Sequence, residues 1–295
     1  MRVDTYMTGF VLVMASAGVA VLGMLAVRRR IEPRVLVACH EVGGYLLSVT
    51  GTLYAVLLGL IVVDAMSTFQ EAHQTIVQES NALADIVLLA RGTPGAQHEE
   101  LVRLAVEYVE LVTGPEWSAM DRGHVSHEAR GTALRLIEIV KRTEPRTESE
   151  KSIHDAQVGA ALQFWNSRRA RSILAAQRIP PLKWFVLIVG GVITVIFTYF
   201  FVIEHPKIQA AMTALVAVSI SLNIFLVVMF GYPFSGELRV DPACFRVIRE
   251  LAEDPRLGTD PGPSSSRPVS RHRNESGRTG IRRTEEPFAN GGPAG

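Results

Sequence analysis

Four long apolar runs, separated by charged segments, constrain the fold of this chain more than any other feature. They cover residues 7–27, 43–65, 183–203 and 208–230. About 20 apolar residues at 1.5 Å per residue cross a hydrocarbon core of roughly 30 Å, so each run can span a bilayer as a helix. A composition of 48% hydrophobic and 20% charged residues over 295 positions also fits an integral membrane protein better than a soluble domain.

The ends of these runs indicate how they cross. The first run is followed by the arginines at 28–30, whereas a secretory signal carries its positive charge before the apolar stretch. We therefore expect an uncleaved anchor. Only residues 204–207 separate the last two runs, and this short polar link predicts a tight membrane hairpin, with Pro206 stopping the helix.

Between the second and third runs the pattern changes to charged helices. Apolar residues recur at helical spacing from Phe69 to Ala90, which predicts that the second span leaves the membrane as one continuous rod, ended by Gly92, Pro94 and Gly95. Three further helices are expected at 97–113, 125–143 and 150–177. No stretch alternates like a strand, so the predicted fold class is all-α, with four transmembrane helices and an inserted helical domain.

This reading divides the chain into four parts. Residues 1–65 hold the first two spans, residues 66–182 the water-exposed domain, and residues 183–253 the membrane hairpin with a C-terminal segment. Residues 254–295 are rich in Pro, Gly, Ser and Arg, and this composition predicts a disordered tail. Arginines of the tail are diluted by glutamates, so no nucleic acid partner is expected; the lipid bilayer is the expected surrounding.

Charge counting leaves the orientation open. With four spans, both termini and the inserted domain share one side of the membrane. The arginines at 28–30 and Arg34 favour a cytoplasmic position for the opposite side, whereas Arg168, Arg169, Arg171 and Lys183 favour a cytoplasmic domain.

The second span carries small residues along one face, at spacings of three and four. They are Gly44, Ser48, Gly51, Ala55 and Gly59, with Thr52 close by. Small residues permit close packing of helices in lipid, and the same face can border a pore in an oligomer. Asp64 ends this span; a ring of such carboxylates favours cations, and the residue can equally lie at the membrane interface.

The residues give little support to catalysis. His124, His127 and Glu128 stand at helical spacing but lack the order of a zinc-protease motif. There is no glycine-rich phosphate loop, no nucleophile elbow and no pair of neighbouring cysteines. The sequence therefore predicts a protein that is not an enzyme, with no cofactor and no metal site.

Four ordered segments carry a family resemblance. They are GTLYAVLLGLIVVDAMSTFQEAHQTIVQESNALADI, YVELVTGPEWSAMDRG, RIPPLKWFVLIVGG and GYPFSGELRVDPACF. The chain from about Val35 to Arg249 resembles the bacterial bestrophin-like membrane family, which is distantly related to the bestrophins. The resemblance to those pentameric anion channels implies a bacterial inner-membrane protein whose helical domain and termini are cytoplasmic. The positions that match the segments are Tyr54, Glu79, Glu116, Trp117, Pro233, Phe234, Ser235 and Gly236.

Two of these segments also have a physical interpretation. Trp117, after Gly114 and Pro115, is expected to anchor a turn against the helical bundle. Residues 233–236 are expected to close the fourth span as a turn that seats the chain against the domain, because Pro233 stops a helix and Gly236 permits positive φ.

Taken together, the sequence predicts an oligomeric ion channel, pentameric if the bestrophin resemblance holds, with inorganic ions passing along the second spans. The alternative is a non-conducting membrane scaffold or sensor whose helical domain binds a partner. A scaffold can act as a monomer, with the small-residue face buried between its own helices.

Overall fold

The structure is a computed structural model of the chain, and it describes residues 6–31, 40–90, 95–201 and 205–253. All regular elements of these residues are helical and none is a strand, which confirms the predicted all-α class. The tail that was predicted to be disordered, residues 254–295, lies outside the described residues, as do Gly92 and Pro94.

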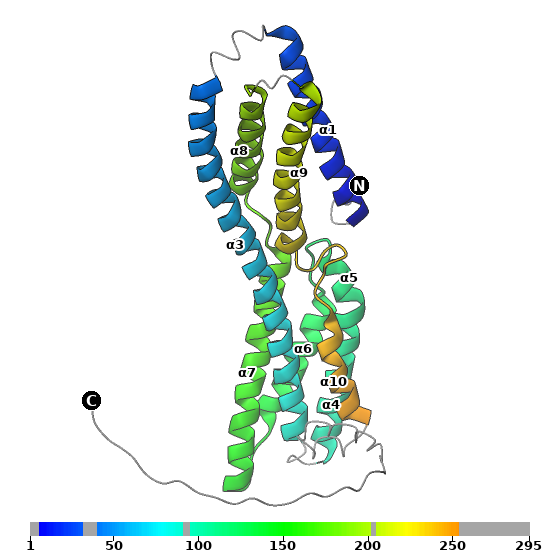
Figure 1. The fold of residues 1–295 in the computed structure, drawn as a ribbon. Coiled ribbons are helices and arrows are strands. Elements are labelled where there is room, and N and C mark those ends of the chain that lie inside the picture. The colour runs from blue at the N-terminus through cyan, green and yellow to red at the C-terminus, as the bar shows by residue number, and fades with distance from the viewer. Residues whose placement is uncertain (1–5, 32–39, 91–94, 202–204, 254–295) are drawn as a thin grey trace, which may run out of the picture. The chain divides into compact units, whose positions relative to one another are not determined.

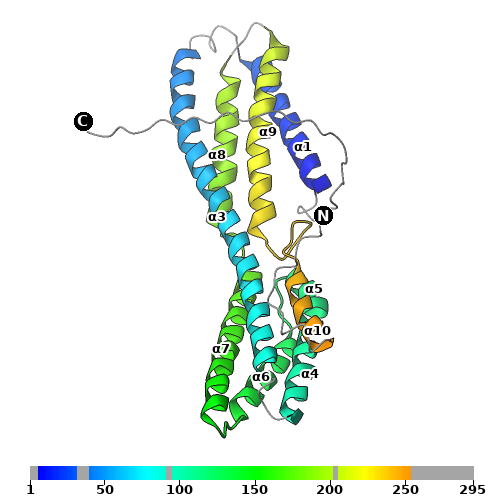
Figure 2. The ribbon, with the colours of Figure 1, turned by 60° about the horizontal axis from the view of Figure 1, so that its bottom comes forward.

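Four helices are long and apolar enough to cross a membrane. They are α1 (Tyr6–Arg30), α3 (His40–Leu89), α8 (Pro181–Tyr199) and α9 (Pro206–Gly231). Helix α9 packs against α1, α3 and α8, so the four form one bundle in which α3 contributes its first half (Figures 1 and 2). The four predicted spans are therefore confirmed as helices.

Helix α3 is the longest element, with 50 residues. At 1.5 Å per residue it is about 75 Å long, more than twice the roughly 30 Å of a hydrocarbon core. The sequence between His40 and Leu89 contains no proline, and all its glycines lie in the first half, where a lipid environment favours helix. This confirms the prediction that the second span continues as an unbroken rod.

The link between α8 and α9 differs from the prediction. Helix α8 ends at Tyr199, before the predicted limit of the third span at residue 203, and residues 202–204 lie outside the described residues. Pro206 therefore does not stop α8. It begins α9, because a missing N–H costs nothing at the first helical position and the ring already fixes a helical φ.

The second half of α3 belongs to a helical domain. Its other members are α4 (Gly95–Leu111), η2 (Val112–Glu116), α5 (Trp117–Met120), α6 (His127–Arg142), α7 (Glu148–Ala176), η3 (Pro242–Phe245) and α10 (Arg246–Glu253). The Ser126 hydroxyl caps α6 by accepting from Ala129 N, and the Thr147 hydroxyl caps α7 by accepting from Glu150 N. The three predicted helices of this segment are thus present, with ends shifted by one or two residues.

The segment around Pro115 is where the structure departs most from the expectation of a turn. Val112–Glu116 forms a π-helix that joins α4 to α5 without interrupting the helical path. Proline has no N–H and its ring crowds the carbonyl four residues earlier, and the wider π turn accommodates both effects. Trp117 therefore follows a helical bulge and not a turn, although its side chain is buried as expected.

The C-terminal segment completes the core of the helical domain. Phe245 and Ile248 are fully buried beside Leu83, Tyr108 and Phe164, and α10 packs against α3 and α4. The turn after α9 brings the chain back from the membrane bundle: Ser235 N donates to the Tyr232 carbonyl, and Gly236 has a φ of 77°. The prediction that residues 233–236 form a turn of this kind is confirmed.

Tyr54 fastens α3 to α8 inside the membrane bundle. Its ring lies against Gly190, where an added Cβ would stand 2.3 Å from Tyr54 Cδ2, and its hydroxyl donates to the Leu187 carbonyl at 2.9 Å. Small residues permit such close approach of helices where water does not drive association. The two glycines at 190 and 191 are thus required by the ring that fills their place.

We predict that Gly190→Ala lowers the stability of the folded chain by about 1–3 kcal/mol, because the added methyl overlaps the Tyr54 ring. The measurement is thermal unfolding of the purified protein in detergent. Gly18→Ala is the control, since no atom lies within 4 Å of the Cβ it would add. Equal effects of the two substitutions would contradict the proposed contact.

Candidate functional site: a buried arginine–glutamate network

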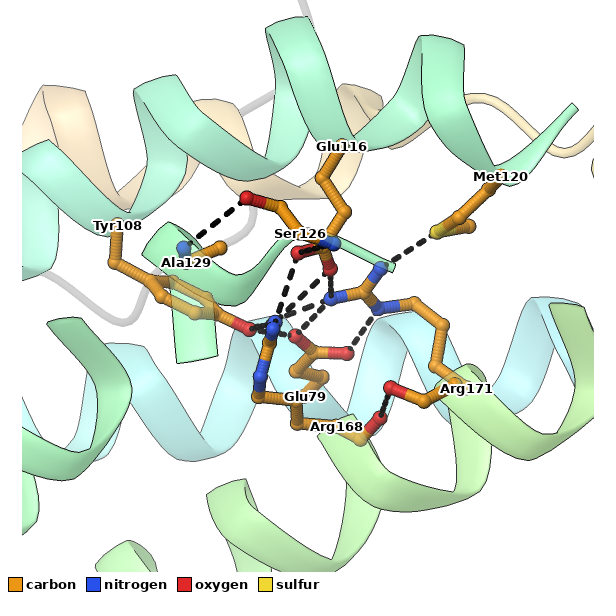
Figure 3. Close-up of polar contacts among 9 residues, drawn as sticks. Glu79, Tyr108, Glu116, Met120, Ser126, Ala129, Arg168 and Arg171 are labelled. Atoms are coloured by element: carbon orange, nitrogen blue, oxygen red, sulfur yellow. Dashed lines mark hydrogen bonds and ion pairs between the residues drawn. The ribbon is translucent and has the colours of Figure 1, made fainter. Parts of the chain in front are cut away.

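Five side chains from four elements of the helical domain converge on one buried polar cluster. Glu79 comes from the second half of α3, Tyr108 from α4, Glu116 from the π turn η2, and Arg168 and Arg171 from α7 (Figure 3). Arg168 and Arg171 are three residues apart and therefore project from the same face of their helix. We call these five residues the charge network.

Arg171 lies at the centre of the charge network. Its Nε is 2.6 Å from Glu79 Oε2 and its Nη2 is 3.0 Å from Glu79 Oε1, which is a two-pronged pairing of guanidinium and carboxylate. The same Nη2 is 2.8 Å from Glu116 Oε1, and Nη1 is 2.8 Å from Met120 Sδ. One arginine therefore ties α3, η2 and α5 to α7.

Arg168 makes the second two-pronged pair. Its Nη1 and Nη2 are each 3.0 Å from the two Glu116 oxygens, and Nη1 also donates to the Tyr108 hydroxyl at 2.8 Å. That hydroxyl in turn donates to Glu79. The backbone N–H of Ser126 donates to Glu116 Oε2 at 3.2 Å, which adds the start of α6 to the same cluster.

Burial makes the pairing obligatory. Glu79, Glu116 and Arg171 are 0% exposed and Arg168 is 3% exposed. An unpaired charge in such a place is strongly destabilising, whereas two arginines and two glutamates balance each other. The charge network is therefore electrically neutral, and each of its carboxylates accepts several hydrogen bonds.

The surroundings raise the pKa values of the three proton-donating side chains of the network, Tyr108, Arg168 and Arg171. Burial raises the pKa of the Tyr108 phenol far above its ordinary value of 10.0, and the Glu79 carboxylate raises it further. Burial alone would lower the pKa of Arg171, but Glu79, Tyr108 and Glu116 together outweigh it and hold this pKa well above the usual range. All three cationic and phenolic groups thus keep their protons at neutral pH.

In this arrangement both carboxylates are engaged by donors from other elements of the domain. The carboxylate pairs are saturated by guanidinium, phenol and backbone donors, so neither glutamate is placed as a general base. Within the described residues no group of three or more His, Cys, Asp or Glu side chains lies together in a way that could hold a metal ion. The chemical role of the network is to fix α3 and α7 relative to each other.

Of the positions that match the family segments, the structure brings Glu79, Glu116 and Trp117 together. Trp117 is 4% exposed, with the Arg171 guanidinium 5.9 Å from its ring centroid and the Phe234 ring packed edge-on at 5.8 Å. The Ser235 hydroxyl donates to the Asp121 carbonyl at 3.2 Å. The turn at 233–236 is thereby seated on the helix that carries Trp117, while Tyr54 lies apart in the membrane bundle.

Sequence reasoning missed the cationic half of the network. In the sequence, Arg168 and Arg171 bear only on membrane orientation, whereas in the structure both are buried. The available signal was the spacing of three residues between the two arginines, together with the place of Glu79 on the apolar face of α3, three residues after Ile76 and four before Leu83. Tyr108 gave no signal beyond its place in a family segment.

The small-residue face of α3 lies apart from the charge network. Ser48, Thr52, Ala55 and Gly59 are exposed on the described chain, whereas Gly44 and Gly51 are half-buried. The residues that contact α8 and α9 are instead Tyr54, Leu58 and Ala65. Asp64 also departs from that face, because its carboxylate is 2.6 Å from Lys183 Nζ at the start of α8.

The polar residues of α9 are placed in two ways. Ser221 shares a hydrogen bond of 2.6 Å with Ser16 of α1, which joins the two helices. Asn223 does not take part in it: its amide donates to the Ser219 carbonyl of its own helix at 2.9 Å. A hydrogen bond within the same helix satisfies the amide without requiring a neighbouring helix.

The fold and the network define a multi-pass membrane protein whose helical domain is built on extensions of its spans. The chain belongs to the bestrophin-like family, because the family model of the Bestrophin-like domain matches residues 14–245. This match confirms the resemblance seen in the sequence. Searches of curated proteins and of solved structures find no match.

We predict that Arg171→Met lowers stability by about 3–5 kcal/mol, because it leaves two buried glutamates without their shared partner. Thermal unfolding followed by circular dichroism measures the loss. The control is Arg135→Met, which breaks the largely exposed pair with Glu107 and should cost no more than about 1 kcal/mol. Similar losses for the two variants would show that the network is not the stabilising element described here.

The raised pKa of Tyr108 predicts an alkaline loss of stability. A group whose pKa is higher in the folded state stabilises the fold fully below its unfolded value, here 10.0, and this contribution falls as pH rises further. Unfolding midpoints measured across that range should therefore fall less steeply for Tyr108→Phe than for the unchanged chain. Tyr45→Phe, at an exposed position, should leave the slope unaltered.

Proposed function

We propose that the protein is an oligomeric ion channel of a bacterial inner membrane, with the small-residue face of α3 lining the pore. Both termini and the helical domain lie on the cytoplasmic side in this proposal. Family membership supports it, because the bestrophins that the family is named after are pentameric anion channels. Transport, and not catalysis, is the proposed activity.

The observation that carries the proposal is how the exposed surface of α3 is divided. Ser48, Thr52, Ala55 and Gly59 are exposed, and no atom of the described chain other than its neighbours and the adjacent backbone of α3 lies within 4 Å of a Cβ added at Gly59. At 100° per residue they form a stripe beside the one that contacts α8 and α9. Small and hydroxyl-bearing residues suit contact with another copy of the helix or with water.

The remaining exposed surface of α3 has a different composition. Its members are large and apolar, and they suit contact with lipid: Val49, Leu53, Val56, Leu60 and Val63. The helix thus has one face toward its own chain, one of lipid character and one of small residues. In the scaffold alternative the small residues were expected between the chain's own helices, and their exposure favours the channel.

The ion pair of Asp64 bears on the sign of the ion. Its partner Lys183 neutralises the carboxylate. Asp64 lies five residues after Gly59, so the two residues are about 140° apart around α3. A ring of unpaired carboxylates is therefore not part of the proposed pore. The proposed lining is uncharged, and anion preference is taken from the bestrophin resemblance.

The experiment is single-channel recording from the purified oligomer in planar bilayers with chloride and sodium gradients. We predict unitary currents with a reversal potential near that of chloride, and a reduced or absent current for Ser48→Trp, because the indole occupies the proposed lining. Leu53→Trp is the matched control, placing the same side chain on the lipid-like face. The absence of current from a well-folded oligomer, or equal effects of the two variants on the current, would favour the scaffold.

A further inference from the structure

A cavity in the helical domain lies beside the charge network, outside the proposed pore. Its volume is about 440 Å³, within the range typical of small-molecule sites. It is lined by Val125, Ser126, His127, Arg130, Trp165, Arg168, Arg169 and Ser172. The walls are the start of α6 and one face of α7, so two helices that the charge network already fixes define its shape.

Two arginines of the lining, Arg130 and Arg169, carry positive charge that no carboxylate of the described residues compensates, while the third, Arg168, is paired with Glu116. Three of its eight residues are arginines and one is a histidine, and none is Asp or Glu. In the part of the chain that the structure describes, neither Arg130 nor Arg169 forms an ion pair, and both are exposed. Glu128, the acidic residue of the first turn of α6, does not line the cavity. An anion entering here meets two cations that no group in the described ranges neutralises.

The floor of the cavity is rigid. Arg168, 3% exposed, is held by both oxygens of Glu116, and Ser126 N donates to one of those same oxygens (Figure 3). Rigid surroundings reduce the ordering cost that a ligand has to meet. The first N–H groups of the 16-residue helix α6 add a favourable partial positive charge at the same end.

Trp165 gives the cavity one aromatic wall, and it is half-buried. A lone inorganic phosphate would fill only part of the volume and would leave this wall without a partner. A phosphate group joined to an apolar or aromatic portion would satisfy both the arginines and the indole. Such a group occurs in soluble phosphate esters and in lipid headgroups.

We propose that this cavity is a binding site for a phosphate ester, with Arg130 and Arg169 pairing with the phosphate and Trp165 contacting the organic portion. A soluble phosphate ester is favoured over a lipid headgroup by the position of the cavity. The cavity lies along α7 between Trp165 and Ser172, on the domain side of Pro181, where the apolar helix α8 begins. The proposal concerns binding only, so it stands or falls independently of whether the protein conducts.

The test is isothermal titration of the purified full-length chain in detergent with phenyl phosphate, with phenol as the neutral counterpart. Saturable binding of phenyl phosphate but not of phenol is expected. Arg130→Gln and Arg169→Gln should each weaken it by about tenfold, the usual scale for loss of one charge-assisted hydrogen bond. Arg146→Gln removes an equally exposed arginine away from the cavity and should leave the affinity unchanged.

A parallel titration uses phosphatidylglycerol in mixed micelles with the same three variants. Binding of lipid that depends on Arg130 and Arg169 supports the phosphate site. If phenyl phosphate does not bind, this result assigns the phosphate to a lipid headgroup. Two results overturn the proposal: no saturable binding of either phosphate compound, or binding that all three arginine variants weaken equally, which reflects net charge alone. Unchanged circular dichroism spectra verify that the variants are folded.

Discussion

The pairing of Arg171 with Glu79 and Glu116 is the interaction on which the helical domain depends. Each of these side chains is fully buried, so none can exist there without the others. Because the partners come from α3, η2 and α7, the electrostatic requirement determines how three helices meet. The apolar core around Leu83 and Phe164 supplies the driving force for burial, while the ion pairs select one arrangement among many similarly compact ones.

Both of the helices that the network joins lead toward the membrane. Helix α3 is itself the second span, and α7 ends at Ala176, shortly before α8 begins at Pro181. Inside the bundle, α3 meets α8, the helix that follows α7, where Tyr54 lies against Gly190 and Gly191. The charge network connects α3 to α7 in the helical domain and the close packing of Tyr54 connects α3 to α8 in the membrane bundle, each by the interaction that its surroundings favour.

Much of this architecture was predictable because it follows from local sequence properties. Runs of about 20 apolar residues define spans, and the absence of proline between His40 and Leu89 predicts the long rod. The π turn was not predictable, since Gly114 and Pro115 ordinarily indicate a break, and only packing around Glu116 shows why the helix continues.

The candidate site was predictable only in part, and for a similar reason. Burial of arginine depends on partners far apart in sequence: Arg171 and Glu79 are 92 positions apart. The small-residue stripe of the second span was visible in the sequence. Which of its members contact the chain's own helices could be learned only from the packing of Tyr54 and Leu58.

The length of α3 has a mechanical consequence. From Glu79 to Ser48 the helix covers 31 residues, or about 47 Å, so a tilt of about 5° around the charge network would displace the other end by about 4 Å. No proline and only Gly51 and Gly59 interrupt this stretch, which leaves few points where bending could absorb the motion. A small change in the angle of α3 at the charge network would therefore produce a larger displacement of the half of the helix that spans the bilayer.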